Sequence, residues 1–255
     1  MTFSFAPDFA VIFVLMFARV GTMMMLMPGL GERAMPMRAR LGVAVLLTMT
    51  LFPLHRLLYA VDLARPAVVV MLLFQELAIG FTLGMAGRIA VSALQTAGVV
   101  IANAMGLGFA MQVDPTQGQQ GAVIGTFLTM VGVAIVFAAD LHHLVIAAIS
   151  SSFTVLRPGV LPVSGDAALF LVGVLSKAFL VAIQLSAPFL VFSLVFNIGL
   201  GVLSKLMPQM QVFFVGMPIS IGVGFLILML VVGVMMVHYT GHLENLLNEL
   251  AVDRR

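Results

Sequence analysis

The segment Asn103-Ala-Met-Gly-Leu-Gly-Phe-Ala-Met-Gln-Val-Asp-Pro-Thr-Gln-Gly-Gln-Gln-Gly121 interrupts a chain that is otherwise almost entirely hydrocarbon. It carries a single charged residue, Asp114, and its other residues are mostly small, flexible or uncharged. Backbone that is not helical is tolerated at membrane depth only where protein buries it or where it lines a water-filled cavity. The segment therefore indicates a gate, a plug or a re-entrant loop in a membrane protein.

The composition on both sides of this segment is that of an integral membrane protein. Of the 255 residues, 62% are hydrophobic and 9% are charged, and the mean hydropathy is +1.19. A soluble domain is about 45–50% apolar and about 25% charged. The net charge of +2 comes from scattered basic residues, so the sequence gives no indication of nucleic-acid binding. The sequence contains no cysteine, which excludes disulfides and thiolate chemistry.

The aromatic residues that usually mark the membrane interface are nearly missing. The chain has no tryptophan and two tyrosines, beside 20 phenylalanines and 20 methionines. Tryptophan and tyrosine normally form belts at both membrane–water interfaces. Two interpretations stay open: phenylalanine has replaced tryptophan by drift, or much of the surface meets protein instead of lipid headgroups.

The apolar runs predict an all-α, polytopic helical membrane protein with long, kinked helices. Most of these runs approach or exceed the ~20 residues that span a bilayer. The run before the central segment is longer than one crossing, so it must tilt, break or leave the membrane. Proline inside three of the runs predicts kinks. The runs cover approximately residues 8–30, 41–59, 67–104, 122–139, 167–203 and 211–238, with a shorter piece at 144–156, and the internal prolines are Pro53, Pro188 and Pro218.

The last two long runs predict a helical hairpin around a polar break that contains Lys205, Pro208, Gln209 and Gln211. After the second run, the tail at 239–255 places leucines at helical spacing, which predicts a short amphipathic helix. At the start of the second run, Pro36 is suited to open a helix.

Four ionisable residues, Arg19, Glu76, Arg88 and Lys177, lie inside apolar runs. Each is costly if it faces lipid, so each should face protein or water. A proton or ion relay with Glu76 as the titrating group is one interpretation, and structural ion pairing is the other. We favour the structural interpretation, because a relay usually shows several buried carboxylates and only Glu76 qualifies.

No catalytic, cofactor or metal site is expected. Asp140, His142 and His143 suggest a metal site at first, but adjacent histidines should splay apart on a helix and nothing completes a tetrahedral set. A polar helix end explains them better. The serines at 150–152 lack the setting of a nucleophile, and the Gly-x-Gly pairs lack a βαβ context.

Small residues recur every four positions in four places and predict close helix packing. Met105 and Met111 lie in the first half of the central segment, where they could be apolar filler or a deformable seal, since methionine adapts its shape. The four repeats of small residues, each forming a stripe on one helix face, are Gly80 and Gly84; Gly98, Ala102 and Gly106; Gly121 and Gly125; and Gly216, Ser220 and Gly224.

Motifs along nearly the whole chain resemble the FliR/SpaR/EscT/HrcT family of type III secretion export-gate proteins. The most specific is the block from Asn197-x-Gly199-x-Gly201 to Met207-Pro208-Gln209-Met210 with Gly216 and Pro218. Gln211 stands where the family usually has asparagine. Further matches are Arg19-Val-Gly with Pro28 and Gly31, Met35-Pro36 with Arg40, Glu76 with Gly80 and Gly84, Gly106 to Asp114-Pro115, Asp140 with His142-His143 and Ser152-Phe153, and Pro188.

The resemblance implies a non-enzymatic subunit of the flagellar export gate, without a cofactor, in the bacterial inner membrane at the flagellar basal body. Its partners would be FliP-like and FliQ-like subunits in a helical assembly, FlhB-like and FlhA-like export components, membrane lipid, and unfolded flagellar proteins as cargo. Residues 1–165 would be FliP-like, 166–240 would be a FliQ-like hairpin, and 241–255 a short amphipathic tail.

Within that architecture, the resemblance implies that residues 104–121 point into the pore and help to plug it. The candidate plug and gating residues are Met105, Gly106, Gly108, Phe109, Met111, Asp114 and Pro115. Asn197 joins Arg19, Glu76, Arg88 and Lys177 as an intramembrane polar residue of structural importance, and Lys205, Pro208, Gln209 and Gln211 form the break between the hairpin helices.

The alternative function is a secondary transporter or channel for small solutes. That class predicts an inverted repeat and a polar midplane site, and the sequence shows neither clearly. A membrane-embedded enzyme is a weaker alternative because no catalytic set of residues supports it.

Overall fold

A computed structural model describes residues 7–27, 36–59, 65–109, 120–159, 164–207 and 212–251, and every regular element among them is helical. This confirms the prediction of an all-α fold. The chain divides into two compact units. Unit 1 comprises Met1–Ala90, Val136–Leu175 and Leu243–Arg255, and unit 2 comprises Val91–Ile135 and Ser176–His242.

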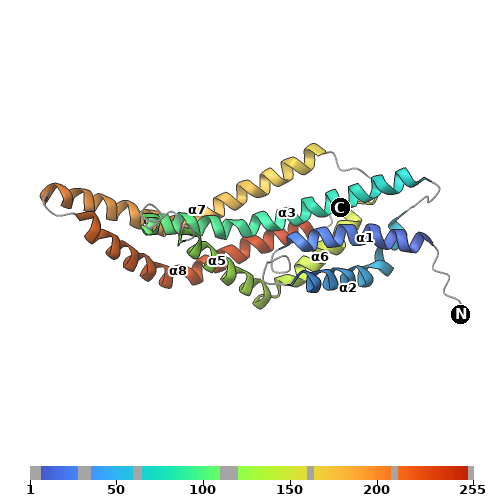
Figure 1. Ribbon diagram of the computed structural model, residues 1–255, viewed down its shortest axis with the longest axis horizontal. Coiled ribbons are helices and arrows are strands. Elements are labelled where there is room, and N and C mark those ends of the chain that lie inside the picture. The colour runs from blue at the N-terminus through green and yellow to red at the C-terminus, as the bar shows by residue number, and fades with distance from the viewer. Residues whose placement is uncertain are drawn as a thin grey trace. The chain divides into compact units, whose positions relative to one another are not determined.

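Three helices of unit 1 start at a proline or directly after one. Pro7 is the first residue of α1 (Pro7–Leu26), and Pro66 is the first residue of α3 (Pro66–Ala104). Pro36 precedes α2 (Met37–His55) with φ −56°, which confirms its predicted role. Proline suits these positions because its missing N–H would be unpaired there anyway. The unit also contains the 3₁₀ helix η1 (Arg56–Leu58). Helix α6 (Leu141–Val155) belongs to it as well (Figure 1).

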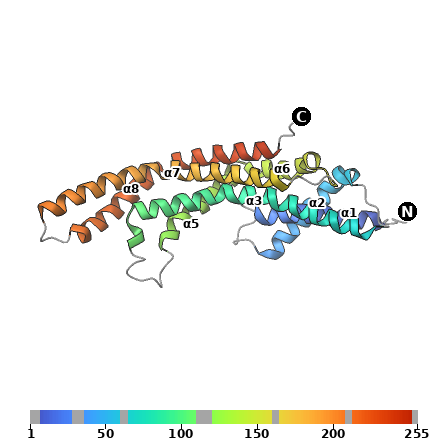
Figure 2. The same ribbon diagram turned by 90° about the horizontal axis from the view of Figure 1, so that it is seen from above.

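Unit 2 contains the second half of α3, the 3₁₀ helix η2 (Leu107–Phe109), most of α5 (Gln120–Ala138), and most of α7 (Ser164–Leu206) and α8 (Val212–Ala251). Within this unit α7 and α8 lie side by side as the predicted hairpin (Figures 1 and 2). His238 Nε2 on α8 lies 2.8 Å from Gln184 Oε1 on α7. Lys205 is exposed in the last turn of α7, while Pro208, Gln209 and Gln211 lie outside the described residues.

Three helices are about twice as long as a bilayer requires. The helices α3, α7 and α8 have 39, 43 and 40 residues. At 1.5 Å per residue each is about 58–65 Å long, whereas the hydrocarbon core of a membrane is about 30 Å thick. Since α3 is continuous, the possibility that this run breaks is excluded. The tail also continues α8 as far as Ala251 and does not start a separate helix.

Five described helices are long and apolar enough to cross a membrane, and α5 with α6 could make a sixth crossing as one bent pair. The bend between them is 79°. It occurs at Asp140, whose φ of 55° and ψ of 18° are left-handed. Aspartate tolerates this conformation better than most residues because its short polar side chain bonds locally.

The glycine stripes mark close approaches between helices, as predicted. A Cβ added at Gly80 would lie 2.6 Å from the Arg19 carbonyl oxygen on α1. A Cβ at Gly98 on α3 would collide with the backbone of Gly125 on α5. A Cβ at Gly216 on α8 would lie 2.8 Å from Leu200 Cδ2 on α7. Each stripe therefore brings two helix backbones, or a backbone and a large side chain, into direct contact.

Candidate functional sites

The central segment begins at a well-defined helix end in unit 2. The Met105 N–H donates to the Ile101 carbonyl at 2.9 Å, and the Gly106 N–H donates to the Asn103 carbonyl at 3.1 Å. Gly106 has φ +87°. Glycine adopts this left-handed conformation without the steric cost that other residues meet, and it commonly ends helices in this way. The sequence thus stops α3 at this point and turns the chain.

Met105 fixes this helix end against α8. Its side chain is completely buried. A Cβ added at Gly224 would lie 2.5 Å from Met105 Cγ and 2.8 Å from Met105 Cε, so the methionine fills the space that the glycine leaves. A methionine suits such a notch because its unbranched chain adapts to irregular gaps. Gly108 packs tightly against the side chain of Asn103, since a Cβ at Gly108 would lie 2.6 Å from Asn103 Oδ1.

A small cleft of about 50 Å³ with a mixed polar and apolar lining lies beside this helix end. Asn197 on α7, one of the predicted structural residues, contributes to its wall and donates from Nδ2 to Ser193 Oγ at 3.1 Å. A space of this size with several polar groups can hold one or two water molecules. The lining residues are Asn103, Ala104 and Gly106 from α3 and the turn after it, Ser193, Phe196, Asn197 and Leu200 from α7, and Met217 and Ser220 from α8.

The structure thus brings Met105, Gly106, Gly108 and Asn197 together at the end of α3. The backbone of Phe109 ends η2. Met111, Asp114 and Pro115 lie outside the described residues.

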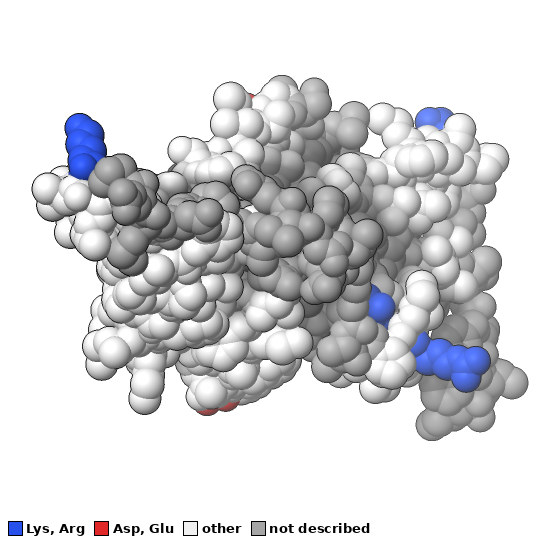
Figure 3. All heavy atoms as spheres, turned by 60° about the vertical axis from the view of Figure 1, so that its left-hand side comes forward, with Lys and Arg blue, Asp and Glu red and all other residues white. Residues whose placement is uncertain are grey.

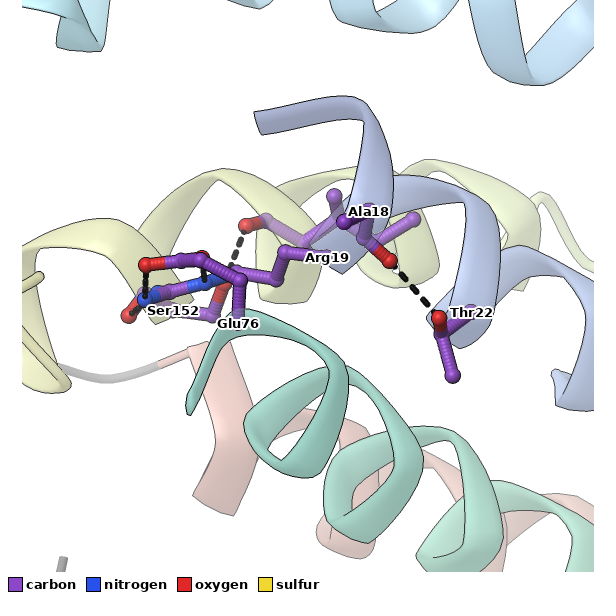
Figure 4. A network of polar contacts seen from close by, with 6 residues as sticks. Ala18, Arg19, Thr22, Glu76 and Ser152 are labelled. Atoms are coloured by element: carbon purple, nitrogen blue, oxygen red, sulfur yellow. Dashed lines mark hydrogen bonds and ion pairs between the residues drawn. The ribbon is translucent and has the colours of Figure 1, made fainter. Parts of the chain in front are cut away.

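Unit 1 contains a buried ion pair that joins three helices (Figure 4). Arg19 of α1 donates from Nε and Nη2 to the two carboxylate oxygens of Glu76 on α3, the second at 2.9 Å. Arg19 Nη1 donates to the Ser152 carbonyl oxygen on α6 at 2.7 Å. Both charged side chains have no exposed surface. Such a bidentate pair has the fixed geometry of two parallel charge-assisted hydrogen bonds.

Aromatic rings cover the cationic side of this pair. The Arg19 guanidinium lies 4.6 Å from the centroid of the Phe153 ring. The His55 ring of α2 stacks on Phe153 with a centroid distance of 5.0 Å, and His55 Nε2 lies 3.0 Å from Ser150 Oγ. Burying two ions costs several kcal/mol each unless the geometry and the remaining hydrogen bonds are good. Here the bidentate pair, the carbonyl and the ring meet that condition.

Tyr59 lies at the edge of this cluster, immediately after η1. Burial raises the pKa of the Tyr59 hydroxyl, and the negative charge of Glu76 raises this pKa further. The phenol therefore stays protonated at physiological pH.

The other two predicted intramembrane charges are not in this network. Arg88 is exposed on α3, and Lys177 is exposed on α7. That all four charged residues have structural roles stays a prediction. Sequence reasoning did not identify His55 as a neighbour of the ion pair. The available signal was that His55 is a polar residue inside an apolar run, like Arg19 and Glu76.

The expectation that the adjacent histidines splay apart is wrong. The rings of His142 and His143 lie 4.2 Å apart between centroids. Successive side chains diverge in the middle of a helix. His142 and His143 instead lie in the first turn of α6, immediately after the left-handed Asp140.

Beyond these sites, the described surface is dominated by apolar side chains. The face shown in Figure 3 carries a few separate Lys or Arg groups and small areas of Asp or Glu among uncharged atoms. On α8, Met229 and Val237 expose 83% and 74% of their surface. Contiguous apolar surface of this kind faces lipid or other proteins.

Comparison with known proteins links this architecture to bacterial secretion. Residues 10–246 match the model of the family described as bacterial export proteins, family 1. The flagellar biosynthetic protein FliR of Caulobacter vibrioides is 37% identical over 247 residues, which are 96% of this chain and 98% of that protein. FliR of Pectobacterium carotovorum is 32% identical over 212 residues, covering 83% and 80% of the two chains. Yop proteins translocation protein T of Yersinia pestis is 26% identical over 170 residues, covering 66% and 65%.

Proposed function

This chain belongs to the bacterial export proteins, family 1, and from that premise we propose that it is a subunit of the flagellar type III secretion export gate. In this role it joins FliP-like and FliQ-like subunits and helps to form and plug the channel through which unfolded flagellar proteins cross the inner membrane. The end-to-end similarity to a flagellar biosynthetic protein carries the proposal.

The apolar helices support an assembly with other helices. The length of α3, α7 and α8 exceeds the thickness of a bilayer about twofold, so part of their apolar surface needs cover other than lipid. Partner helices supply such cover. The absence of tryptophan from the sequence agrees with a surface that mostly meets protein. FlhB-like and FlhA-like components are further expected partners at the flagellar basal body.

The end of α3 supports a plug at residues 104–121. A plug has to start from a fixed point, and burial of Met105 in the notch at Gly224 provides one. The left-handed Gly106 then turns the chain out of the helix. The uncharged composition of the following residues suits backbone that is shielded by protein. Closing and opening a channel needs no catalytic group or cofactor, so we assign the chain no enzymatic activity.

The first test is copurification and complementation in a flagellated bacterium. We expect the tagged full-length chain to leave the membrane together with FliP-like and FliQ-like proteins. We also expect deletion of its gene to abolish secretion of flagellin, and the full chain to restore it. Isolation of the chain alone, active in the transport of a small solute, would favour the transporter and overturn the gate assignment. Restored secretion of injectisome substrates but not of flagellin would move the chain to the other type III system.

A further inference from the structure

The turn between α5 and α6 carries a cluster to which the proposed export function gives no role. One ligand atom from each of Asp140, His142 and His143 lies within 4.8 Å of the other two. A carboxylate and two imidazoles are donors that divalent transition metals accept.

The backbone at this turn directs the carboxylate toward the imidazoles. Asp140 occupies the N-cap position of α6, yet its side chain makes no capping hydrogen bond. Asp140 Oδ1 instead lies 4.0 Å from His143 Nδ1. The side chains of Asp140 and His143 are 76% and 71% exposed, so both are free to rotate toward a shared ion.

His142 supplies a second and independent observation. Its ring packs against Phe137 with a centroid distance of 5.7 Å, which restricts its orientation. His142 Nδ1 is buried and has no hydrogen-bond partner among the described residues. An imidazole nitrogen that is shielded from water without a partner is costly, and a metal ion bound at this nitrogen would supply the missing partner.

We propose that Asp140, His142 and His143 form a binding site for one divalent transition-metal ion of the Zn²⁺ type. Two imidazole nitrogens and one carboxylate oxygen make three protein ligands, and water completes a tetrahedral set. Bond lengths of about 2.0–2.1 Å place tetrahedral ligand atoms about 3.4 Å apart. Rotation of the two exposed side chains closes the remaining gap from 4.8 Å.

The ligands are the left-handed residue Asp140 and two residues in the first turn of α6, so a bound ion ties Asp140 to the start of that helix. Magnesium and calcium prefer sites made only of oxygen ligands, and they do not compete for two imidazoles. This inference does not depend on the export function, since it concerns the ligand chemistry of one turn.

The test uses the full-length chain, purified with its membrane partners through a tag without histidine and stripped of metal with a chelator. Binding of Zn²⁺ is measured by calorimetry, and bound Co²⁺ is observed through its visible absorption. We expect one saturable site per copy of this chain and an intense Co²⁺ spectrum typical of tetrahedral geometry. Mg²⁺ and Ca²⁺ in millimolar excess should not displace the ion.

Three variants and one control decide the outcome. H142Q, H143Q and D140N should each weaken Zn²⁺ binding at least tenfold, and D140N keeps a residue that tolerates the left-handed backbone. H238Q is the matched control, because His238 contacts Gln184 on the α7–α8 hairpin, and it should bind Zn²⁺ like the unaltered chain. Because His143 is mostly exposed, H143Q should assemble even if H142Q does not. Failure of the chain to bind, or equal binding by H143Q and the unaltered chain, overturns the proposal.

Discussion

Helix α3 uses the same packing device twice, once in each unit, with different chemistry. In unit 1, Glu76, Gly80 and Gly84 are spaced at i, i+4 and i+8, and all three contact α1. In unit 2, Gln95 and Gly98 face α5, where Gly125 approaches both. In unit 1 both carboxylate oxygens of Glu76 accept hydrogen bonds from Arg19. In unit 2, among the described residues, Gln95 Oε1 accepts one long hydrogen bond of 3.5 Å from Thr129.

The difference teaches how one apolar helix can be held by a buried ion pair in one unit and by close glycine contacts in the other. A buried ion pair defines one arrangement of α1, α3 and α6, because every alternative leaves a charge without a partner. In unit 2 the described contacts of α3 with α5 and α8 depend on glycine and apolar side chains instead of a buried charge. Unit 2 also contains the end of α3 from which the proposed plug starts.

The largest expected effect comes from breaking the ion pair. E76Q leaves Arg19 buried without its counter-charge and should destabilise the assembled protein by about 3–5 kcal/mol. Thermal unfolding of the purified complex and the amount of the chain in membranes measure this loss. R88Q is the control on the same helix, because Arg88 is exposed, and it should change stability little.

The double variant R19M/E76M sharpens this test. Replacement of both charges by apolar side chains removes the unpaired ion, so it should recover a large part of the stability that E76Q loses. If E76Q is as stable as R88Q, the ion pair does not hold unit 1 together and the comparison fails.

A smaller effect is expected from filling the glycine contact of unit 2. In G98L the new side chain meets the backbone of Gly125, so α3 and α5 have to separate. Overpacking of this kind costs about 1–3 kcal/mol. G199L is the matched control, since nothing lies within 4 Å of a Cβ at Gly199. Unfolding temperatures of the two variants should differ clearly, and equal values would show that the close contact at Gly98 is not needed.

A single methyl group added at Gly224 should disturb Met105, the residue that anchors the proposed plug. G224A places a Cβ against Met105, which has to move, and should cost about 1 kcal/mol. We expect a measurable rise in ion leak through the membrane as well. G222A is the control two residues away, because nothing lies within 4 Å of a Cβ there.

M105A supplies a second comparison at the same contact. In the double variant M105A/G224A, the shortened side chain at position 105 leaves room for the methyl group added at position 224. The effects of the two substitutions on stability should therefore be non-additive, as expected for side chains in contact. Strict additivity would contradict the assignment of Met105 as the anchor.

The smallest effect is expected at Gln95, the neutral counterpart of Glu76. Q95L removes one hydrogen bond at the limit of its distance range and should change stability by less than about 1 kcal/mol. The ratio of this loss to that of E76Q measures how differently the two units are held. A loss as large as that of E76Q would show that both units depend on a polar pair.

The helices were predictable from the sequence because apolar runs and proline positions encode them locally. The pairing of Arg19 with Glu76 was not, because the two residues are 57 positions apart and no local pattern connects them. The close rings of His142 and His143 were missed because the left-handed Asp140 depends on the turn between two helices. The family resemblance is confirmed by the comparisons. The pore and the plug stay proposals.

The most direct test of the export-gate assignment is the permeability of a membrane that contains the assembled complex after about ten residues within 106–120 are deleted. The chain must first be shown to copurify with its partners in normal amounts, so that loss of assembly is excluded. We predict that ions and small solutes then cross the membrane, while the unaltered complex stays closed. An assembled deletion variant with unchanged permeability would contradict the proposal that this segment closes the channel.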